Sequence, residues 1–506
     1  MKNKYYITTP IYYPNDKPHL GHAYTNICCD ILARFARLKE YDVYFLTGTD
    51  EHGQKLQKAA ENADMQPSEF VDSKVISFLE LNSLLNISND DFIRTTQIRH
   101  TSSVQYLWNL LLEKGHIYKG KYDGWYSVRD ESFYSENELR PDGKAPTGAE
   151  VEWVEEESFF FRLSHFQDKL LEFYESNHDF IQPTSRRNEV INFVKSGLKD
   201  LSISRTSFTW GIKVPNEQNH VIYVWLDALT NYISALGYPN EGGKMKEFWP
   251  ANVHMIGKDI LRFHAIFWPA FLMAADIKLP KHIAIHGWWM NEGEKMSKSI
   301  GNVIDPVSIV QKYNADALRY FVAKEMPFGQ DGNFVEKNLQ NRYNTELANK
   351  IGNLLQRTLA LVRKNFDSKI PNVKSIEDLY KDSELLQIAA VSYEEIDNFL
   401  QKYEFHNALE QIIKIADRAN EYIDQIAPWH LIKTDLEKTA EVLYILVETC
   451  RYIATLLQAF IPDSADKMLH QLNIHIDMRK FKCLNSDFAL KPGTAINSIQ
   501  PIFVKF

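Results

Sequence analysis

The apolar residues near the N-terminus follow two periodicities, and together they predict a βαβ unit. Residues 5–9 have the composition of a buried strand that Pro10 stops, and residues 42–47, rich in β-branched and aromatic side chains, predict a second strand. Between them, apolar residues recur at helical spacing, namely Tyr24, Ile27, Cys28, Ile31, Leu32, Phe35 and Leu38. Such units build parallel sheets that bind ligands at the carboxyl ends of their strands. Residues 19–22, where this helix begins, are therefore placed for ligand binding.

The middle of the chain has a different texture, which predicts an inserted subdomain. From about residue 120 to residue 200 the chain is rich in Tyr, Trp, Glu and Gly, with turn signals at residues 141–143 and 146–148. Further strands are expected at residues 221–226, 254–256 and 282–286, where the alternating α/β pattern returns. The insertion is therefore expected to split one sheet into two parts.

Beyond about residue 340 the pattern becomes helical. One apolar stripe consists of Leu347, Ile351, Leu354, Thr358, Leu361 and Val362, and another of Leu443, Leu446, Val447, Cys450, Ile453, Leu457 and Phe460. The whole pattern predicts an α/β fold: a Rossmann-type parallel sheet split by an inserted connective subdomain, followed by an all-α helix bundle. The sheet domain is expected at residues 1–117 and 206–290, and the insertion between them at residues 118–205. A linking region is expected at residues 291–340 and the bundle at residues 341–506.

Composition and charge narrow the classes of function. The chain has 506 residues, 44% hydrophobic and 24% charged, as in an ordinary globular protein of about three domains. Its net charge of −9 argues against a general attraction to nucleic acid. Any such contact must come from a local basic strip, which the cluster Lys350, Arg357, Arg363 and Lys364 permits.

Targeting and redox signals are weak. The apolar run at residues 265–275 is broken by Pro269 and is shorter than the roughly 18 residues that a membrane span needs. The polar residues at the N-terminus lead into a strand and not into the apolar core of a signal peptide. We therefore expect no membrane span and a cytoplasmic protein. The four cysteines are too scattered for a disulfide framework or a four-cysteine metal site.

Two short motifs carry the candidate chemistry. His19 and His22, with Gly21 between them, would face an anion together with the backbone N–H groups at the start of the helix. Lys295 and Lys298 lie on a polar loop flanked by glycines, which suits a mobile lid over pyrophosphate. Taken singly, the histidines are better explained as helix caps and the lysines as a solvated loop. Half of a zinc site is a further alternative for the histidines, but no glutamate follows the first one and no third ligand is evident. Together the two motifs predict that a nucleoside triphosphate is held from both ends and activates a carboxylic acid.

These motifs resemble the HIGH and KMSKS signatures of class I aminoacyl-tRNA synthetases, and the chain is similar to the methionyl-tRNA synthetase family from Lys4 to about Leu431. The further segments that carry this resemblance are residues 11–13, 48–53, 224–228, 257–260, 286–288 and 427–429. The resemblance implies that residues 291–340 hold the KMSKS loop and a stem-contact region, and that residues 341–506 bind an anticodon. It also implies ATP and Mg²⁺ as reactants, with His19, His22, Lys295 and Lys298 stabilising the transition state.

The resemblance also assigns the amino-acid site. It implies that Asp50 binds the α-ammonium group, although a helix N-cap would suit the same position. It implies a methionine side-chain pocket formed by Ile11, Tyr13, Trp225, Ala228, Tyr232 and His286. Aromatic walls suit a polarizable thioether, and Tyr232 or His286 could offer its sulfur a weak hydrogen bond. For each aromatic residue taken alone, core packing is the competing interpretation.

The nucleotide and tRNA contacts are implied in the same way. Asp259 matches the ribose ligand, for which a salt bridge to Lys258 is the alternative, while Gly257 and His264 are expected to help seat the adenosine. In the helical region, the anticodon contacts would come from Asn353, Arg357 and Trp429. A tryptophan and an arginine suit an unstacked base, although bundle packing and a surface pair would explain them without the family context.

One departure from the family concerns zinc. Many members carry C-x-x-C knuckles in the insertion, but Ser127 and Asp130 stand at the first pair, and residues 145–148 lack the second. We expect no structural zinc and instead an insertion held by turns and by aromatic side chains such as Trp125, Trp153 and residues 159–161.

The expected function is methionyl-tRNA synthesis in two steps, with L-methionine, ATP and tRNA(Met), including initiator tRNA, as substrates. A monomer is expected, with residues 485–506 folding back toward the catalytic half. Because a missing methyl is worth only about 1–3 kcal/mol, homocysteine should be partly activated and proofread within the synthetic site. The alternatives are a cysteinyl-tRNA synthetase, a small-molecule nucleotidyltransferase and a non-enzymatic tRNA-binding protein derived from a synthetase.

Overall fold

The computed structural model describes residues 2–130, 132–134, 136–296 and 301–506. Its main sheet has six parallel strands in the order β3-β2-β1-β12-β13-β7, so strands from before, within and after the expected insertion meet in one sheet. Their bounds are β1 Lys4–Tyr12, β2 Asp42–Thr49, β3 Asp91–Arg94, β7 Ile181–Gln182, β12 Val253–Gly257 and β13 His282–His286. The strand order reverses between β1 and β12, which opens a crevice at their carboxyl ends.

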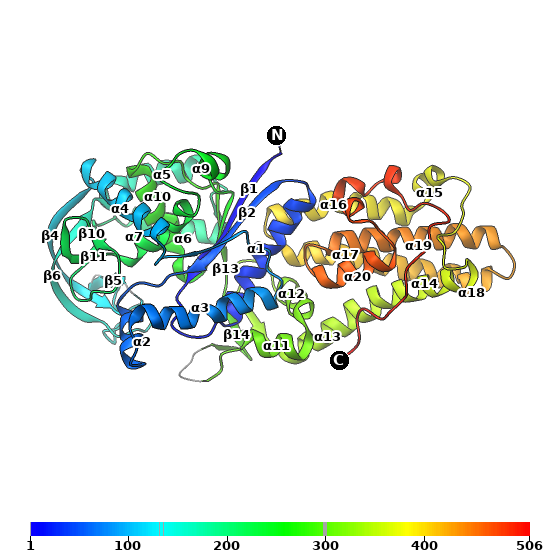
Figure 1. The fold of residues 1–506 in the computed structure, drawn as a ribbon, viewed down its shortest axis with the longest axis horizontal. Helices are drawn as coiled ribbons and strands as arrows, with labels where there is room; N and C mark the ends of the chain where they lie inside the picture. Colours follow the sequence, from blue (N-terminus) through cyan, green and yellow to red (C-terminus); the bar gives the residue numbers. More distant parts are fainter. Residues whose placement is uncertain (1, 131, 135, 297–300) are drawn as a thin grey trace.

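Helices cover both faces of this sheet (Figure 1). Successive strand residues point to opposite faces, so Val43 and Phe45 join the apolar cluster that contains the helix α1, whereas Tyr44 and Leu46 join the cluster on the other face. The helices of this half are α1 Leu20–Leu38, α2 Gln54–Asn62, α3 Pro67–Leu84, α4 Ile98–Glu113, α5 Gln167–Ser176, α6 Thr184–Lys195, α7 Val224–Leu229, α8 Asn231–Ser234, α9 Gly243–Phe248 and α10 Trp268–Ala274.

Two of the strand predictions were wrong in detail. Pro10 does not stop β1, which continues to Tyr12 after a register shift between Thr8 and Ile11. A bulge tolerates proline because it does not require every ladder N–H. The expected strand at 221–226 ends at Ile222 as part of β11 Glu217–Ile222, and the next residues form helix α7. A short apolar run cannot be distinguished from a buried helix by periodicity alone, and here burial of Leu226 and Leu229 selects the helix.

The insertion contains an antiparallel sheet in the order β5-β4-β6-β8. Its strands are β4 Ile117–Ser127, β5 Ser132–Tyr134, β6 Glu152–Phe161 and β8 Leu201–Ser202. Two small sheets follow, one of β9 Ser204–Arg205, β10 Lys213–Val214 and β11, the other of β14 Trp289–Asn291, β15 Glu294–Lys295 and β16 Gly332–Phe334. Although β7 lies inside the interval 118–205, it pairs with β13 at the edge of the main sheet.

Hydrogen bonds occupy the positions at which the family resemblance would place zinc knuckles. The Asp130 backbone N–H donates to Ser127 Oγ at 3.2 Å, and the Asp130 carboxylate accepts hydrogen bonds from the hydroxyls of Thr147 and Tyr134. These contacts join the two turns of the region without a metal ion. A serine and one carboxylate do not supply the thiolate donors of a structural zinc site, so the residues present do not fit zinc.

Aromatic side chains attach the insertion to the main body. Phe161 packs edge-on against Phe271 of α10 with ring centroids 4.8 Å apart, and Phe159 packs against Trp108 of α4 at 5.5 Å. Trp125 and Trp153 contact each other within the insertion at 5.3 Å. Aromatic packing therefore acts both inside the insertion and across its boundary.

The C-terminal half is a helix bundle. The structure confirms both predicted stripes: all seven residues of the second stripe are buried, and in the first only Leu361 is partly exposed. The linking region and bundle contain α11 Pro306–Tyr313, α12 Ala315–Lys324, α13 Glu336–Arg342, a π-helical turn at Tyr343–Gly352, α14 Asn353–Asn365, α15 Ile376–Asp382, α16 Glu384–Gln401, α17 Phe405–Ile426, α18 Pro428–Leu431, α19 Leu436–Leu457 and α20 Pro462–Gln471.

The last residues return along the bundle to the linking region (Figure 1). The Phe506 ring packs against Tyr313 at 4.8 Å and against Tyr343 at 4.6 Å, and Asn344 Nδ2 donates to the Phe506 carbonyl oxygen at 3.1 Å. The final segment therefore contacts α11, which follows the loop of the second motif.

One buried arginine joins the two halves of the molecule. Arg319 of α12 forms an ion pair with Asp30 of α1 at 2.7 Å and donates to the carbonyl oxygens of Leu85 at 3.1 Å and Phe460 at 2.8 Å. These partners come from the half that contains the main sheet and from the loop between α19 and α20. Helix α12, the second helix after the lysine motif, is therefore fixed to both halves by one side chain.

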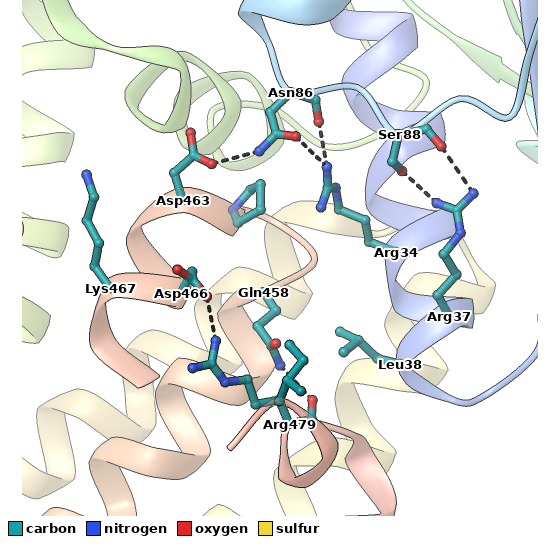
Figure 2. Close-up of a pocket in the computed structure, with 12 residues that line it drawn as sticks. Arg34, Arg37, Leu38, Asn86, Ser88, Gln458, Asp463, Asp466, Lys467 and Arg479 are labelled. Atoms are coloured by element: carbon teal, nitrogen blue, oxygen red, sulfur yellow. Dashed lines mark hydrogen bonds and ion pairs between the residues drawn. The ribbon is translucent and has the colours of Figure 1, made fainter. Parts of the chain in front are cut away.

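A cavity of about 570 Å³ lies beside this joint (Figure 2). Its walls come from α1, from the loop after α3 and from α20 with the turn that follows it. The arginines in its walls are bonded to neighbours: Arg34 donates to the Asn86 carbonyl oxygen at 2.6 Å and Arg479 to Asp466 at 2.5 Å.

Within the residues that the structure describes, no helix combines the length and apolar character needed to cross a bilayer.

Candidate active site

His19 and His22 lock the start of α1 through a reciprocal pair of hydrogen bonds. His19 Nδ1 accepts from the Gly21 N–H at 3.0 Å, and His22 Nδ1 accepts from the His19 N–H at 3.0 Å. The rings stack with centroids 3.9 Å apart. Because each Nδ1 is an acceptor, the proton of each neutral ring lies on Nε2, which is then a donor suited to phosphate.

Gly21 is required for a reason that the sequence did not indicate. A Cβ atom at this position would lie 2.8 Å from Cε1 and 3.0 Å from Nδ1 of His19. The absent side chain therefore makes room for the imidazole itself, and the cap of α1 depends on this glycine.

The chain that follows the second motif returns to the first. The Leu20 N–H donates to the Ile304 carbonyl oxygen at 3.2 Å, next to the histidine pair. Before the motif, β14 follows β13 out of the main sheet, and the Lys295 backbone pairs with Met290 in β15. Lys298 lies in 297–300, outside the described residues. The flanks of the lysine motif are thus beside the start of α1.

Asp50 presents a buried acceptor at the end of β2. Its carboxyl group is 4% exposed, and Oδ1 has no hydrogen-bond partner among the described residues. Burial and the nearby Asp227 carboxylate raise the pKa of Asp50 well above its usual range. A buried carboxylate oxygen with no partner is a costly arrangement that a bound ammonium group would relieve. Asp50 does not cap α2, which begins at Gln54 with Gly53 as its N-cap.

Aromatic residues form a wall around helix α7, whose Asp227 carboxylate acts on Asp50. Trp225 of α7 stacks face to face on Phe263, with centroids 3.7 Å apart and planes at 4°. Ile11, at the end of β1, and the following Tyr13 are half-buried against the same apolar cluster, and Ala228 is buried one residue after Asp227. Helix α7 and the end of β1 thus contribute predicted pocket residues to the same apolar cluster.

Tyr232 and His264 form a hydrogen-bonded pair at the base of this wall. The Tyr232 hydroxyl lies 2.7 Å from His264 Nε2, and His264 Nδ1 lies 3.1 Å from the Ile260 carbonyl oxygen. Nδ1–H therefore donates to Ile260, and Tyr232 donates its proton to Nε2. Burial lowers the pKa of His264 to about 4, so the neutral ring persists at neutral pH. His264, expected near the adenosine, thus directly contacts a predicted methionine-pocket residue.

His286 is held at the end of β13 by two further hydrogen bonds. Its Nδ1 lies 2.8 Å from the Gly287 carbonyl oxygen and its Nε2 lies 2.8 Å from Thr25 Oγ1 of α1. Burial lowers the pKa of His286. Both ring nitrogens are therefore engaged within the protein, and His286 links β13 to the helix that starts at the histidine pair.

Asp259 lies at the mouth of the crevice, after β12. Its Oδ1 accepts from Trp288 Nε1 at 3.1 Å, whereas Lys258 forms an ion pair with Asp331 at 2.7 Å. Lys258 is thus paired with Asp331, and the alternative of a salt bridge between Lys258 and Asp259 is not found among the described residues. A Cβ atom at Gly257 would lie 2.6 Å from Asp259 Oδ1, so this glycine allows the carboxylate its position.

Two predicted residues of the bundle meet at its surface. The Arg357 guanidinium lies 5.3 Å from the centre of the Trp429 ring and donates to Asp424 at 2.6 Å. Asn353 lies one turn earlier on α14 and is exposed. Trp429 is presented by the short helix α18, which follows the sharp turn at Ala427, where φ is +47°. These three residues lie close enough to form one surface.

Sequence reasoning missed three polar residues behind the wall, His52, His100 and Asp227. Asp227 Oδ2 accepts from His52 Nδ1 and its Oδ1 accepts from His100 Nε2, each at 2.7 Å. His52 and Asp227 lie inside segments that carried the family resemblance, but their roles were not considered. The available signal was that His52 and Asp227 each lie within two residues of a predicted ligand, whereas His100 carried no such signal.

Comparisons with known proteins show the family of the chain. A family model described as "tRNA synthetases class I (M)" matches residues 5–148 and 139–359, and one described as "Anticodon binding domain of methionyl tRNA ligase" matches residues 375–506. The chain belongs to the class I methionyl-tRNA synthetase family. It is accordingly an aminoacyl-tRNA ligase.

Relatives match along their whole length. A methionine–tRNA ligase of Rickettsia felis is 58% identical over 507 residues, covering 100% of this chain and 99% of the relative. One of Brucella suis biovar 1 is 50% identical, covering 100% and 98%. The structure of Mycobacterium tuberculosis methionyl-tRNA synthetase in complex with methionyl-adenylate has a TM-score of 0.96 at 46% identity, covering 99% of this chain and 100% of that one. Its apo form has a TM-score of 0.90 at 42% identity, covering 100% and 99%.

Proposed function

We propose that this ligase activates L-methionine with MgATP and transfers it to the 3′-terminal adenosine of tRNA(Met), including the initiator. The observation that carries the proposal is the unpartnered oxygen of Asp50 beside the aromatic wall, at the crevice where α1 begins. A positive amino group and an apolar side chain fit these two features. ATP would lie across the start of α1.

In the first step, an oxygen of the methionine carboxylate forms a bond to the α-phosphorus, and the bond from that phosphorus to pyrophosphate breaks. The carboxylate is already ionised, so the step needs orientation and charge stabilisation and no general base. His19 and His22 would donate from Nε2, and Lys295 and Lys298 would neutralise the departing pyrophosphate with Mg²⁺. Asp259 would accept from the ribose hydroxyls, with Gly257 and His264 beside the adenosine.

The methionine site would be divided into two ends. Asp50 would hold the α-ammonium group, and the side chain would lie among Ile11, Tyr13, Trp225, Ala228, Tyr232 and His286. In this arrangement the Tyr232 hydroxyl already donates its hydrogen bond to His264, and His286 is hydrogen-bonded through both ring nitrogens. The thioether is therefore selected by shape and polarizability, and less by a hydrogen bond to sulfur.

In the second step, a hydroxyl of the terminal adenosine attacks the activated carbonyl and AMP leaves. Asn353, Arg357 and Trp429 would bind the anticodon, with the indole as a stacking surface and the arginine as a donor to a base edge. The domains would divide near the bounds that the sequence suggested, except that β7, inside the interval 118–205, belongs to the main sheet. A monomer would suffice because both proposed sites come from one chain. Such an enzyme would act in the cytoplasm, with the translation machinery that uses its product.

The test is pyrophosphate exchange into ATP measured with methionine, cysteine and leucine in parallel. Strong exchange with methionine and little with the others supports the proposal. Exchange that depends on cysteine would favour the cysteinyl alternative, and exchange without an amino acid would favour a small-molecule nucleotidyltransferase. Absence of exchange, with retained tRNA binding, would leave only a tRNA-binding protein.

A further inference from the structure

Asp227 lies between two residues of the proposed methionine wall. It occupies the same short helix, α7, as Trp225 and Ala228, and its side chain is fully buried. Each carboxylate oxygen accepts one imidazole N–H at 2.7 Å, from His52 and from His100. Burial alone would raise the pKa of Asp227, but the two imidazoles outweigh burial and lower it. The residue is therefore a fixed, ionised acceptor.

The two histidines come from different parts of the catalytic half. His52 follows Asp50 by two residues, and its backbone N–H stabilises the charged Asp50 carboxylate. Its ring packs edge-on against Trp210 at 5.5 Å. The link from Asp227 to His52 therefore joins α7, which carries the side-chain wall, to the turn that carries the proposed ammonium ligand.

His100 holds Asp227 from the opposite side. Its Nε2–H donates to Asp227, so its Nδ1 is the acceptor of the Ser234 hydroxyl at 2.8 Å. His100 lies in α4 and Ser234 in α8. Asp227 is thus tied to three elements, and α7 has little freedom to slide relative to β2.

We propose that Asp227, with His52 and His100, is a specificity-determining positioning residue that sets the spacing between the ammonium ligand Asp50 and the wall that ends the side-chain pocket. The proposal rests on the proposed function. A rigid spacing favours one length of the substrate side chain. An amino acid with one more methylene than methionine must displace the wall, and one that lacks the methyl group leaves a gap. Asp227 itself does not touch the substrate.

Asp227→Asn is the main test, because it keeps the shape while one imidazole N–H loses its acceptor. Pyrophosphate exchange would be measured with methionine, with ethionine, which has one more methylene, and with homocysteine, which lacks the methyl. We expect kcat/KM for methionine to fall about tenfold, mainly through KM, and the preference for methionine over ethionine to fall at least about threefold. KM for ATP should stay unchanged.

His220→Gln is the matched control. His220 is also buried, but it belongs to β11, lies 3.0 Å from Ser204 Oγ and packs edge-on against Phe159. Its substitution should leave the methionine-to-ethionine ratio unchanged. Ser234→Ala, which removes only the support of His100, gives a milder second variant if Asp227→Asn does not fold, and should shift the ratio in the same direction.

An equal loss for all three amino acids in Asp227→Asn, or an unchanged ratio in folded Asp227→Asn and Ser234→Ala, would overturn the positioning role. The proposed function is tested separately by the wild-type protein. If wild-type exchange does not depend on methionine, the function fails; if it does and only the ratio in the variants is unmoved, the spacing proposal alone fails.

Discussion

The catalytic half and the helix bundle use buried polar groups in different ways. Behind the crevice, buried ionisable side chains gather around the proposed substrates, and burial lowers the pKa of His254, His264 and His286. In the bundle, α19 buries almost every residue from Thr439 to Leu457 on an apolar frame, and the candidate residues lie at the surface. The catalytic half buries ionisable groups beside the proposed sites of small ligands, whereas the bundle presents its candidate residues on an external surface.

The buried polar groups of the bundle serve its own structure. Arg451 and Glu448 form an ion pair at 2.5 Å, Arg451 also donates to the Cys483 carbonyl oxygen at 2.8 Å, and Glu448 accepts from the Leu490 N–H at 3.3 Å. They thereby fix the final segment on the bundle. This contrast teaches that burial of charge alone does not mark a functional site. Asp50 and Asp316 each have a buried carboxylate oxygen without a partner among the described residues, and Asp50 differs by its place at the carboxyl end of β2, near Asp227.

The largest effect is expected in the first step of catalysis. Lys295→Ala should lower kcat of pyrophosphate exchange by about 10²–10³-fold with little change in methionine binding, since the ammonium group would act mainly on the transition state. Lys337→Ala, an exposed lysine of α13, is the control. Equal losses in kcat and methionine affinity would contradict the assigned role.

Asp50→Asn should raise the KM for methionine by about 100-fold, because a neutral amide cannot form a charge-assisted bond to the ammonium group. Exchange kinetics measure this, and tRNA affinity should not change. Asp316→Asn is a matched control, because Asp316 is also buried with a raised pKa but lies in α12, where it accepts from the Ser464 N–H. A methionine KM within twofold of wild type for Asp50→Asn would remove Asp50 from the site.

Asp50→Asn should also stabilise the free protein at pH 7. The pKa of Asp50 is raised in the folded state, so the folded protein holds this proton more tightly than the unfolded chain. Ionisation of Asp50 therefore lowers the free energy of unfolding as pH rises above the pKa that Asp50 has in the unfolded chain. The asparagine side chain does not ionise, so Asp50→Asn avoids this loss of stability. Thermal unfolding at pH 4 and pH 7 should show a gain that is larger at pH 7.

In the bundle, Trp429→Ala should lower kcat/KM for tRNA aminoacylation by roughly tenfold to a hundredfold, because stacking of one base is worth about 1–3 kcal/mol. Pyrophosphate exchange without tRNA should remain at the wild-type rate. Trp153→Ala, a half-exposed tryptophan of the insertion, controls for general loss of aromatic surface. A fall in tRNA-free exchange would break the separation between the two regions.

The smallest effect concerns acid stability. The pKa of His264 is about 4 in the folded protein, whereas an unperturbed histidine has a pKa of 6.5. The neutral His264 therefore contributes its full share of the folding free energy above pH 6.5, and this share is lost as pH falls toward 4. His264→Gln should move the acid-unfolding midpoint down by less than about one pH unit, because buried His254 and His286 still act in the same direction. His475→Gln, on an exposed side chain, should leave the midpoint unchanged.

Much of the fold followed from local patterns. The apolar stripe of α19 and the βαβ unit around α1 were predicted because their periodicities are long and regular. The segment at 224–226 was mistaken for a strand because a short buried run carries no periodic signal. Asp50, His19 and His22 were found through motifs, but the need for Gly21 arose from the His19 ring, which folds back over the backbone.

By itself the sequence determined the alternation of sheet and helix, the family, and which residue types were available for each role. Only the tertiary structure decided which distant residues meet: Ile304 with Leu20, Arg357 with Trp429, and Asp227 with both His52 and His100. The physical reason is that periodicity records which face of an element is buried. Hydrogen bonds between elements depend on the packing of whole helices, which no local pattern specifies.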